Sequence, residues 1–229
     1  MDVDLMMELG TRELSERQAT LLWTGLRQLQ LAKAAARVHR EMMARGGVTS
    51  TAAFASRGLH QEQTNGAFIA ALLSESPTDS EADVSRIVEE VGFPGAAADS
   101  AARACIYELA VFRNLMKAAS KQVVERSVAD AVVAEFDAEV PGLVAVRDTL
   151  AHLDERFSGE ARGRAISPQA TLVQGEPMEL GAVVEIDRIS AHTASGQFVT
   201  VEFGDDTFIA TRNAFRKMIA LFPPATATS

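Results

Sequence analysis

Apolar residues recur at helical spacing over most of the first 157 positions of the chain. Leu22, Leu26 and Leu29 lie three or four residues apart, which predicts a helix over residues 11–44 with one apolar face. Thr11 or Ser15 can cap its start, and two consecutive glycines follow its end. The same spacing predicts further helices over residues 61–73, 81–91, 98–125, 128–136 and 142–157.

The pattern changes after Gly159. Residues 159–168 combine glycine, arginine, serine and proline without an apolar period, which predicts a linker. Stretches rich in branched and aromatic residues then predict short strands at 182–189, 197–203 and 207–210. Helical spacing returns over residues 212–222, and two prolines end it.

Together these elements predict a mainly α fold, a helical bundle with a small C-terminal antiparallel β-meander and a terminal helix. The predicted segments are a bundle at 1–158, a linker at 159–168, the meander and helix at 169–224, and a disordered tail at 225–229. Short strands are marginal alone in water, so we expect the C-terminal segment to pack on the helical body or on a second subunit.

The chain is acidic overall but has two locally basic segments. The chain of 229 residues has 22 basic and 31 acidic residues and a net charge of -9, which opposes nonspecific binding to nucleic acid. Residues 27–45, however, hold five basic residues against one acidic, and residues 101–126 hold five against two. If those two helices lie side by side they form a basic face; the alternative is two ordinary solvated helix surfaces.

Several classes of protein are disfavoured by the sequence. No apolar run is long enough to span a bilayer, and the acidic N-terminus lacks the basic start and apolar run of a signal peptide, which predicts a cytoplasmic protein without a membrane contact. Cys105 is the single cysteine, so an intramolecular disulfide and a multi-cysteine zinc site are excluded. Glycine-rich phosphate loops, metalloprotease histidine pairs and serine nucleophile elbows are absent, and we expect no cofactor and no metal.

Residues 147–152, with the sequence Arg-Asp-Thr-Leu-Ala-His, are the one segment whose side chains suggest a chemical function. On a helix the apolar residues around them fall in one sector, at Leu143, Val146, Leu150, Leu153 and Phe157. Arg147 and His152 then lie on the opposite face, and Asp148 is four residues before His152, where it can hydrogen-bond the imidazole and fix its tautomer.

This segment resembles the signature of the HEPN superfamily, in which an Arg, then commonly Asn, Asp or His, is followed after a few residues by a His on a late helix of a helical bundle. The match comprises Arg147, Asp148 and His152; position 154, where the family commonly has an aromatic residue, is Asp. Many members are metal-independent ribonucleases that act as homodimers with both motifs at the dimer cleft. Other members are noncatalytic binding modules.

The resemblance implies a specific chemistry. An imidazole at His152 suits proton transfer, Arg147 can bind phosphate and stabilise developing charge, and Asp148 can orient His152. Arg156, Arg162 and Arg164 follow the motif and can extend a phosphate-binding strip; the alternative is that they serve solubility.

The leading hypothesis is therefore a HEPN-like RNA-processing protein, a homodimeric and metal-independent endoribonuclease. The alternative is a noncatalytic helical dimerisation or protein-interaction module. A third interpretation of the Arg147–His152 segment is an ordinary exposed helix face.

Overall fold

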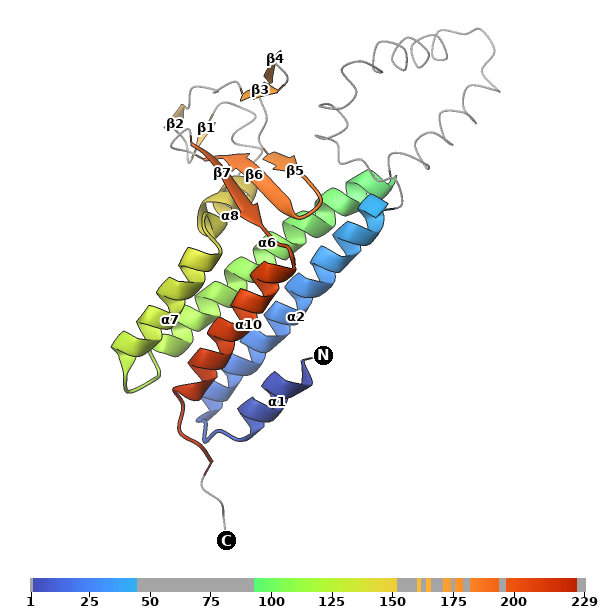
Figure 1. The fold of residues 1–229 in the computed structure, drawn as a ribbon. Helices are drawn as coiled ribbons and strands as arrows, with labels where there is room; N and C mark the ends of the chain where they lie inside the picture. Colours follow the sequence, from blue (N-terminus) through green and yellow to red (C-terminus); the bar gives the residue numbers. More distant parts are fainter. Residues whose placement is uncertain are drawn as a thin grey trace, which may run out of the picture.

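The protein is mainly helical, with a small antiparallel sheet and a terminal helix (Figure 1). The computed structural model describes residues 2–44, 93–151, 160–161, 164–165, 171–173, 176–178, 182–193 and 197–225. The helices are α1 (Val3–Gly10), α2 (Glu16–Ala44), α6 (Phe93–Ser120), α7 (Arg126–Glu139), α8 (Leu143–Ala151) and α10 (Asp205–Ala220). The helices predicted at 61–73 and 81–91 lie outside the described residues.

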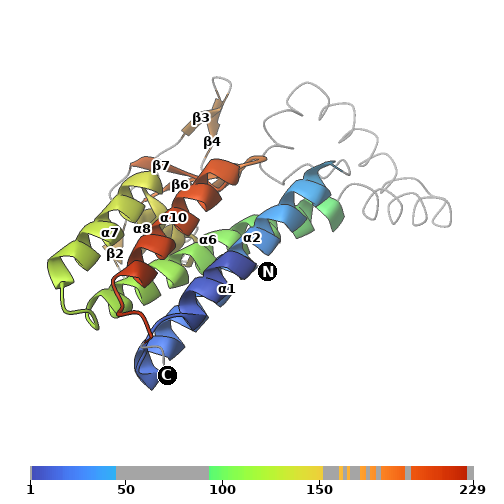
Figure 2. The ribbon, with the colours of Figure 1, turned by 60° about the horizontal axis from the view of Figure 1, so that its bottom comes forward.

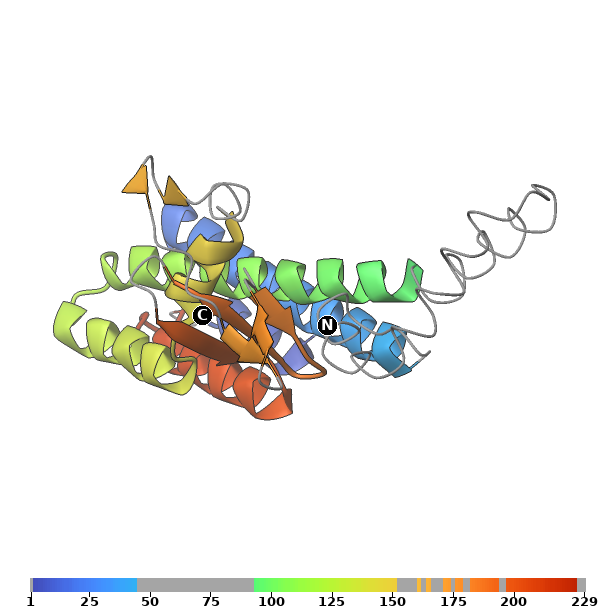
Figure 3. The same cartoon turned by 90° about the horizontal axis from the view of Figure 1, so that it is seen from above.

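The main sheet is an antiparallel meander in the order β5-β6-β7. Its strands are β5 (Ala182–Val184), β6 (Arg188–His192) and β7 (Phe198–Glu202). Ile189 in β6 is opposite Val184 on one side and Val201 on the other, and all three are buried. The sheet packs on α8 at the end of the bundle where α7 ends and α10 begins (Figures 1 and 3).

Two smaller strand pairs precede this sheet. They are β1 (Glu160–Ala161) with β2 (Arg164–Ala165), and β3 (Thr171–Val173) with β4 (Glu176–Met178). The first pair lies within residues 159–168, so the range predicted as a linker contains a short antiparallel hairpin.

Ser15, rather than Thr11, caps the long helix α2. The Ser15 N–H donates to Gln18 Oε1 at 2.8 Å, and the Gln18 N–H donates to Ser15 Oγ at 3.3 Å. This reciprocal pair is a capping box, which satisfies two N–H groups that the first turn leaves free. Thr11 instead ends α1, a short helix that the apolar pattern did not predict.

The prediction was wrong at the starts of α6 and α10. The prediction placed a break at 92–95, but α6 begins at Phe93, because a proline at position 94 is tolerated in the first turn, where its missing N–H costs no hydrogen bond. Residues 207–210, predicted as a strand, form the first turns of α10. Gly204 precedes this helix, and the carboxylates of Asp205 and Asp206 favour its positive N-terminal end.

The helices share one core. α2 and α6 run antiparallel and pack along their length, while α10 lies against α7, α2 and α6 (Figures 1 and 2). Phe112 of α6 contacts Phe136 of α7 and Phe215 of α10 edge-on, with ring centroids 5.6 and 5.4 Å apart. Residues of the predicted bundle and of the predicted C-terminal segment therefore lie in the same hydrophobic cluster.

The end of the chain returns to the start. The Glu13 N–H donates to Pro223 O at 2.9 Å, and the Ala225 N–H donates to Thr11 O at 2.8 Å. These bonds tie the segment after α10 to the turn between α1 and α2. Of the tail predicted at 225–229, residues 226–229 lie outside the described part of the chain.

Gly142 fixes the approach of α8 to the sheet. Its φ is +78°, and a Cβ there would lie 2.3 Å from Val199 Cγ1 in β7. We expect Gly142→Ala to lower the free energy of unfolding by about 2 kcal/mol, because it adds left-handed backbone strain and a clash. Gly10→Ala is the control, since nothing lies within 4 Å of its added Cβ. Equal denaturant midpoints for the two variants would contradict this account.

Candidate functional site

Helix α8 carries the Arg147 motif and is held by its apolar side. Leu143, Val146 and Leu150 are buried, as the helical period predicts. Thr149 is also buried, and its hydroxyl donates to Ala145 O at 2.9 Å. This side packs on α6 and on strands β6 and β7. Leu153 and Phe157, the other members of the predicted stripe, lie outside the described residues.

Arg147 is half-exposed and makes two contacts. Its Nη1 donates to Asp148 Oδ1 at 2.9 Å. Its guanidinium carbon is 5.7 Å from the ring centroid of Tyr107 on α6, a cation–π distance. The side chain is 43% exposed. A guanidinium stacked on an aromatic ring keeps donors free for a phosphate, which suits anion binding.

Asp148 has a partner that the sequence did not predict. Asp148 accepts a hydrogen bond from Arg147, whereas the prediction pairs it with His152. His152 follows the last described residue of α8, so the Asp148–His152 bond stays a prediction. Tyr107 was missed, because it lies forty positions before Arg147 and only the packing of α6 on α8 brings them together.

The predicted arginine strip is only partly covered by the structure. Arg164 lies in β2, where its backbone pairs with Ala161 of β1. Nothing is described of its side chain, and Arg156 and Arg162 lie outside the described residues. The strip stays a prediction.

The predicted basic face is partly neutralised. The two basic helices do lie side by side, as α2 and α6. However, Arg37 pairs with Glu41 at 2.7 Å, and Arg40 pairs with Asp205 at 3.1 Å. Arg113 donates to both carboxylate oxygens of an aspartate on α7, and this hydrogen bonding raises the pKa of Arg113. Part of this positive charge is therefore already paired within the protein.

His39 is a structural histidine that sequence reasoning did not single out. It is fully buried, with Nδ1 2.8 Å from Ala98 O and Nε2 2.9 Å from Glu185 O. Its ring also packs edge-on against Phe203 at 5.4 Å. Both nitrogens are occupied, so His39 ties α2 to α6 and to the turn between β5 and β6 and is not accessible for proton transfer.

Cys105 is not a nucleophile. It is fully buried on α6, and burial raises the pKa of its thiol to about 12. We expect the folded protein to resist iodoacetamide at pH 8, because the thiolate is the reactive form. Mass spectrometry should show full alkylation once guanidinium unfolds the chain. Rapid alkylation of the folded protein would contradict the buried position.

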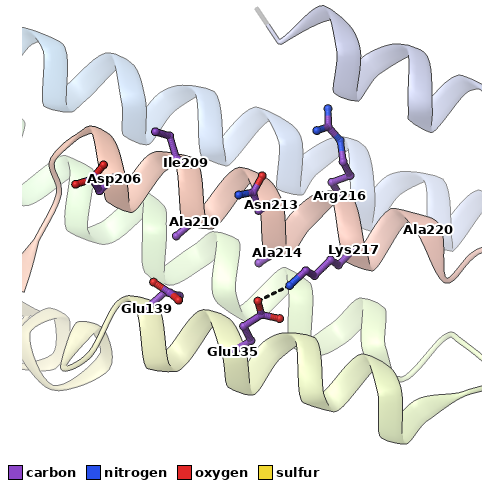
Figure 4. A pocket seen from close by; sticks show the side chains of 10 residues that line it. All are labelled: Glu135, Glu139, Asp206, Ile209, Ala210, Asn213, Ala214, Arg216, Lys217 and Ala220. Atoms are coloured by element: carbon purple, nitrogen blue, oxygen red, sulfur yellow. Dashed lines mark hydrogen bonds and ion pairs between the residues drawn. The ribbon is translucent and has the colours of Figure 1, made fainter.

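A pocket of about 580 Å³ lies between α7 and α10 (Figure 4). Its walls carry charges of both signs, and Glu135 pairs with Lys217 across it. Among the residues that the structure describes, no three histidine, cysteine, aspartate or glutamate side chains are grouped to hold a metal ion. Nor does any described helix have the length and apolarity to cross a membrane.

Comparisons of the chain with models of known protein families, with curated proteins and with solved structures find no match.

Proposed function

We propose that this protein is a HEPN-like RNA-processing enzyme, a metal-independent endoribonuclease that acts as a homodimer. The observation that carries the proposal is the placement of Arg147. Its guanidinium lies over the ring of Tyr107 and is hydrogen-bonded to Asp148, while 43% of the side chain is exposed. A cation held in one place before the substrate arrives stabilises transition-state charge better than a mobile one.

The proposed reaction uses the neighbouring hydroxyl of the RNA. His152 removes the proton of the 2′-hydroxyl, and the 2′-oxygen attacks the adjacent phosphorus. The bond from phosphorus to the 5′-oxygen breaks, and the imidazolium returns its proton to that oxygen. Arg147 stabilises the extra negative charge on the phosphoryl oxygens during this step. The products are a 2′,3′-cyclic phosphate and a 5′-hydroxyl, and no metal ion is needed.

A noncatalytic protein-interaction module is the second candidate. It is favoured by an open groove between α1, α2 and α10, where the apolar side chains of Val3 and Ile209 are 60% and 57% exposed. Exposed apolar side chains beside a groove are typical of protein contact sites.

RNA cleavage in EDTA tests the proposed function. The purified protein, shown by light scattering to be a dimer, is incubated with single-stranded RNA and excess EDTA. We expect fragments with 2′,3′-cyclic phosphate ends, identified by mass spectrometry. Cleavage that requires magnesium, fragments with 3′-hydroxyl ends, or a monomeric protein would contradict the proposal.

A further inference from the structure

The groove between α1, α2 and α10 continues the path of α1. α1 lies along the first part of α2, and α2 continues beyond the N-terminus of α1 (Figures 1 and 2). The residues of α2 that line the groove extend as far as Arg40. The volume of the groove is about 1060 Å³. The part of α2 that lines it runs from Leu26 to Arg40, about 21 Å at the rise of an α-helix, which is the length of a helix of roughly four turns.

α1 itself shows what kind of helix this surface accepts. Its Leu5 and Leu9 are buried in the core. Its carboxylates lie on arginines of α10: Arg212 donates to Asp2 at 2.6 Å and to Asp4 at 2.8 Å. The hydrogen bond from Arg212 lowers the pKa of Asp2. α1 is thus an acidic amphipathic helix, with leucines facing inward and acids on the α10 arginines.

The uncovered part of the groove has the same two features. Its floor is apolar, formed by Leu29 and Phe208 with Ile209 at the rim. Its α2 wall carries Lys33 and Arg37. Lys33 is exposed and forms no ion pair within the described part of the chain. Arg37 pairs with Glu41 of its own helix, and 78% of the arginine side chain is exposed.

The acids of the groove do not cancel this charge. Asp2 and Asp4 are paired with Arg212, and Asp205 is paired with Arg40. Lys33 remains available to an incoming acid, and Arg37, with its side chain 78% exposed, can bind one only by sharing its guanidinium with Glu41. A nucleic acid fits this surface less well, because the described residues that line the groove offer no exposed aromatic ring for base stacking.

We propose that this groove docks an acidic amphipathic helix of a partner protein, end to end with α1. The leucine-type side chains of the partner cover Leu29, Phe208 and Ile209, and its carboxylates bind Lys33 and Arg37. This is the helix-in-groove mode of recognition, with anchors one turn apart. The proposal is independent of RNA cleavage, since α8 takes no part in the groove.

A peptide built from α1 tests the proposal. The probe is a fluorescent peptide made of two consecutive copies of the sequence Asp2–Leu9, and its binding to the full-length protein is measured by fluorescence anisotropy. We expect saturable binding that Lys33→Glu and Arg37→Glu each weaken about fivefold or more. Arg27→Glu is the matched control on the same helix; Arg27 is exposed and does not line the groove, so we expect less than a twofold change.

A second peptide, with every acid replaced by lysine, tests whether reversing the charges on both the peptide and the protein restores binding. We expect it to bind the wild-type protein weakly and the Lys33→Glu variant more tightly. Circular dichroism checks that the variants are folded. No saturable binding of the acidic peptide, or equal binding by Lys33→Glu, Arg37→Glu and wild type, would overturn the proposal. Binding of a single-stranded RNA that depends on Lys33 and Arg37, without peptide binding, would assign the groove to nucleic acid instead.

Discussion

Arg147→Ala is expected to lower the rate of RNA cleavage about a hundredfold, because it removes the cation that stabilises the transition state. Arg147→Lys is expected to recover part of this loss, since lysine keeps the charge and loses the planar fork of donors that matches a phosphate. The rates are measured with a labelled RNA in EDTA. The effect should appear in the cleavage rate at saturating RNA as well as in binding.

Arg126→Ala is the matched control for this variant. Arg126 lies on α7, is exposed, and like Arg147 has an aspartate partner, Asp130 at 3.5 Å. We expect Arg126→Ala to leave cleavage within twofold of wild type. A comparable loss in both variants would show that general surface charge, and not the α8 site, governs the reaction.

Phe112→Ala is expected to lower the free energy of unfolding by about 4 kcal/mol. The ring is fully buried and makes edge-on contacts with Phe136 and Phe215, so its loss opens a cavity where α6, α7 and α10 meet. Phe112→Leu keeps most of the volume and should cost less. Equilibrium denaturation in guanidinium chloride measures both.

Val111→Ala provides the comparison at the neighbouring position of α6. Val111 is 40% exposed, so its truncation should change the free energy of unfolding by less than about 1 kcal/mol. Similar losses for Phe112→Ala and Val111→Ala would mean that the aromatic cluster is not the centre of the core.

The long helices were predictable because their burial repeats with the helical period. Leu22, Leu26 and Leu29 face the core as their spacing indicates, and the local signal extends over several turns. α1 was not predictable in this way. It has eight residues and two buried leucines, and Arg212, some 200 positions later, helps to hold it. The start of α10 was misassigned because residues 207–210 resemble a strand, while the pattern of burial continues to Phe215 as a helix.

In the candidate site too, features set by local spacing were predictable and features set by contacts between distant elements were not. Spacing alone placed Arg147 opposite the buried residues of its helix; in the structure its side chain is 43% exposed and lies over Tyr107 of α6, the helix on which α8 packs. The ring of Tyr107 beneath Arg147 and the two carbonyl partners of His39 depend on contacts between distant elements. A pattern read along one helix carries no information about such contacts.

The most direct test of the proposed function is the initial rate of RNA cleavage in EDTA by His152→Ala, with wild type and Glu155→Gln purified in parallel. His152 and Glu155 both lie on the predicted polar face of the motif helix, but the proposed reaction uses His152 alone as the proton acceptor. We predict a rate at background for His152→Ala and a rate within twofold of wild type for Glu155→Gln. Equal rates for all three proteins, or no cleavage by any of them, would contradict the proposed function.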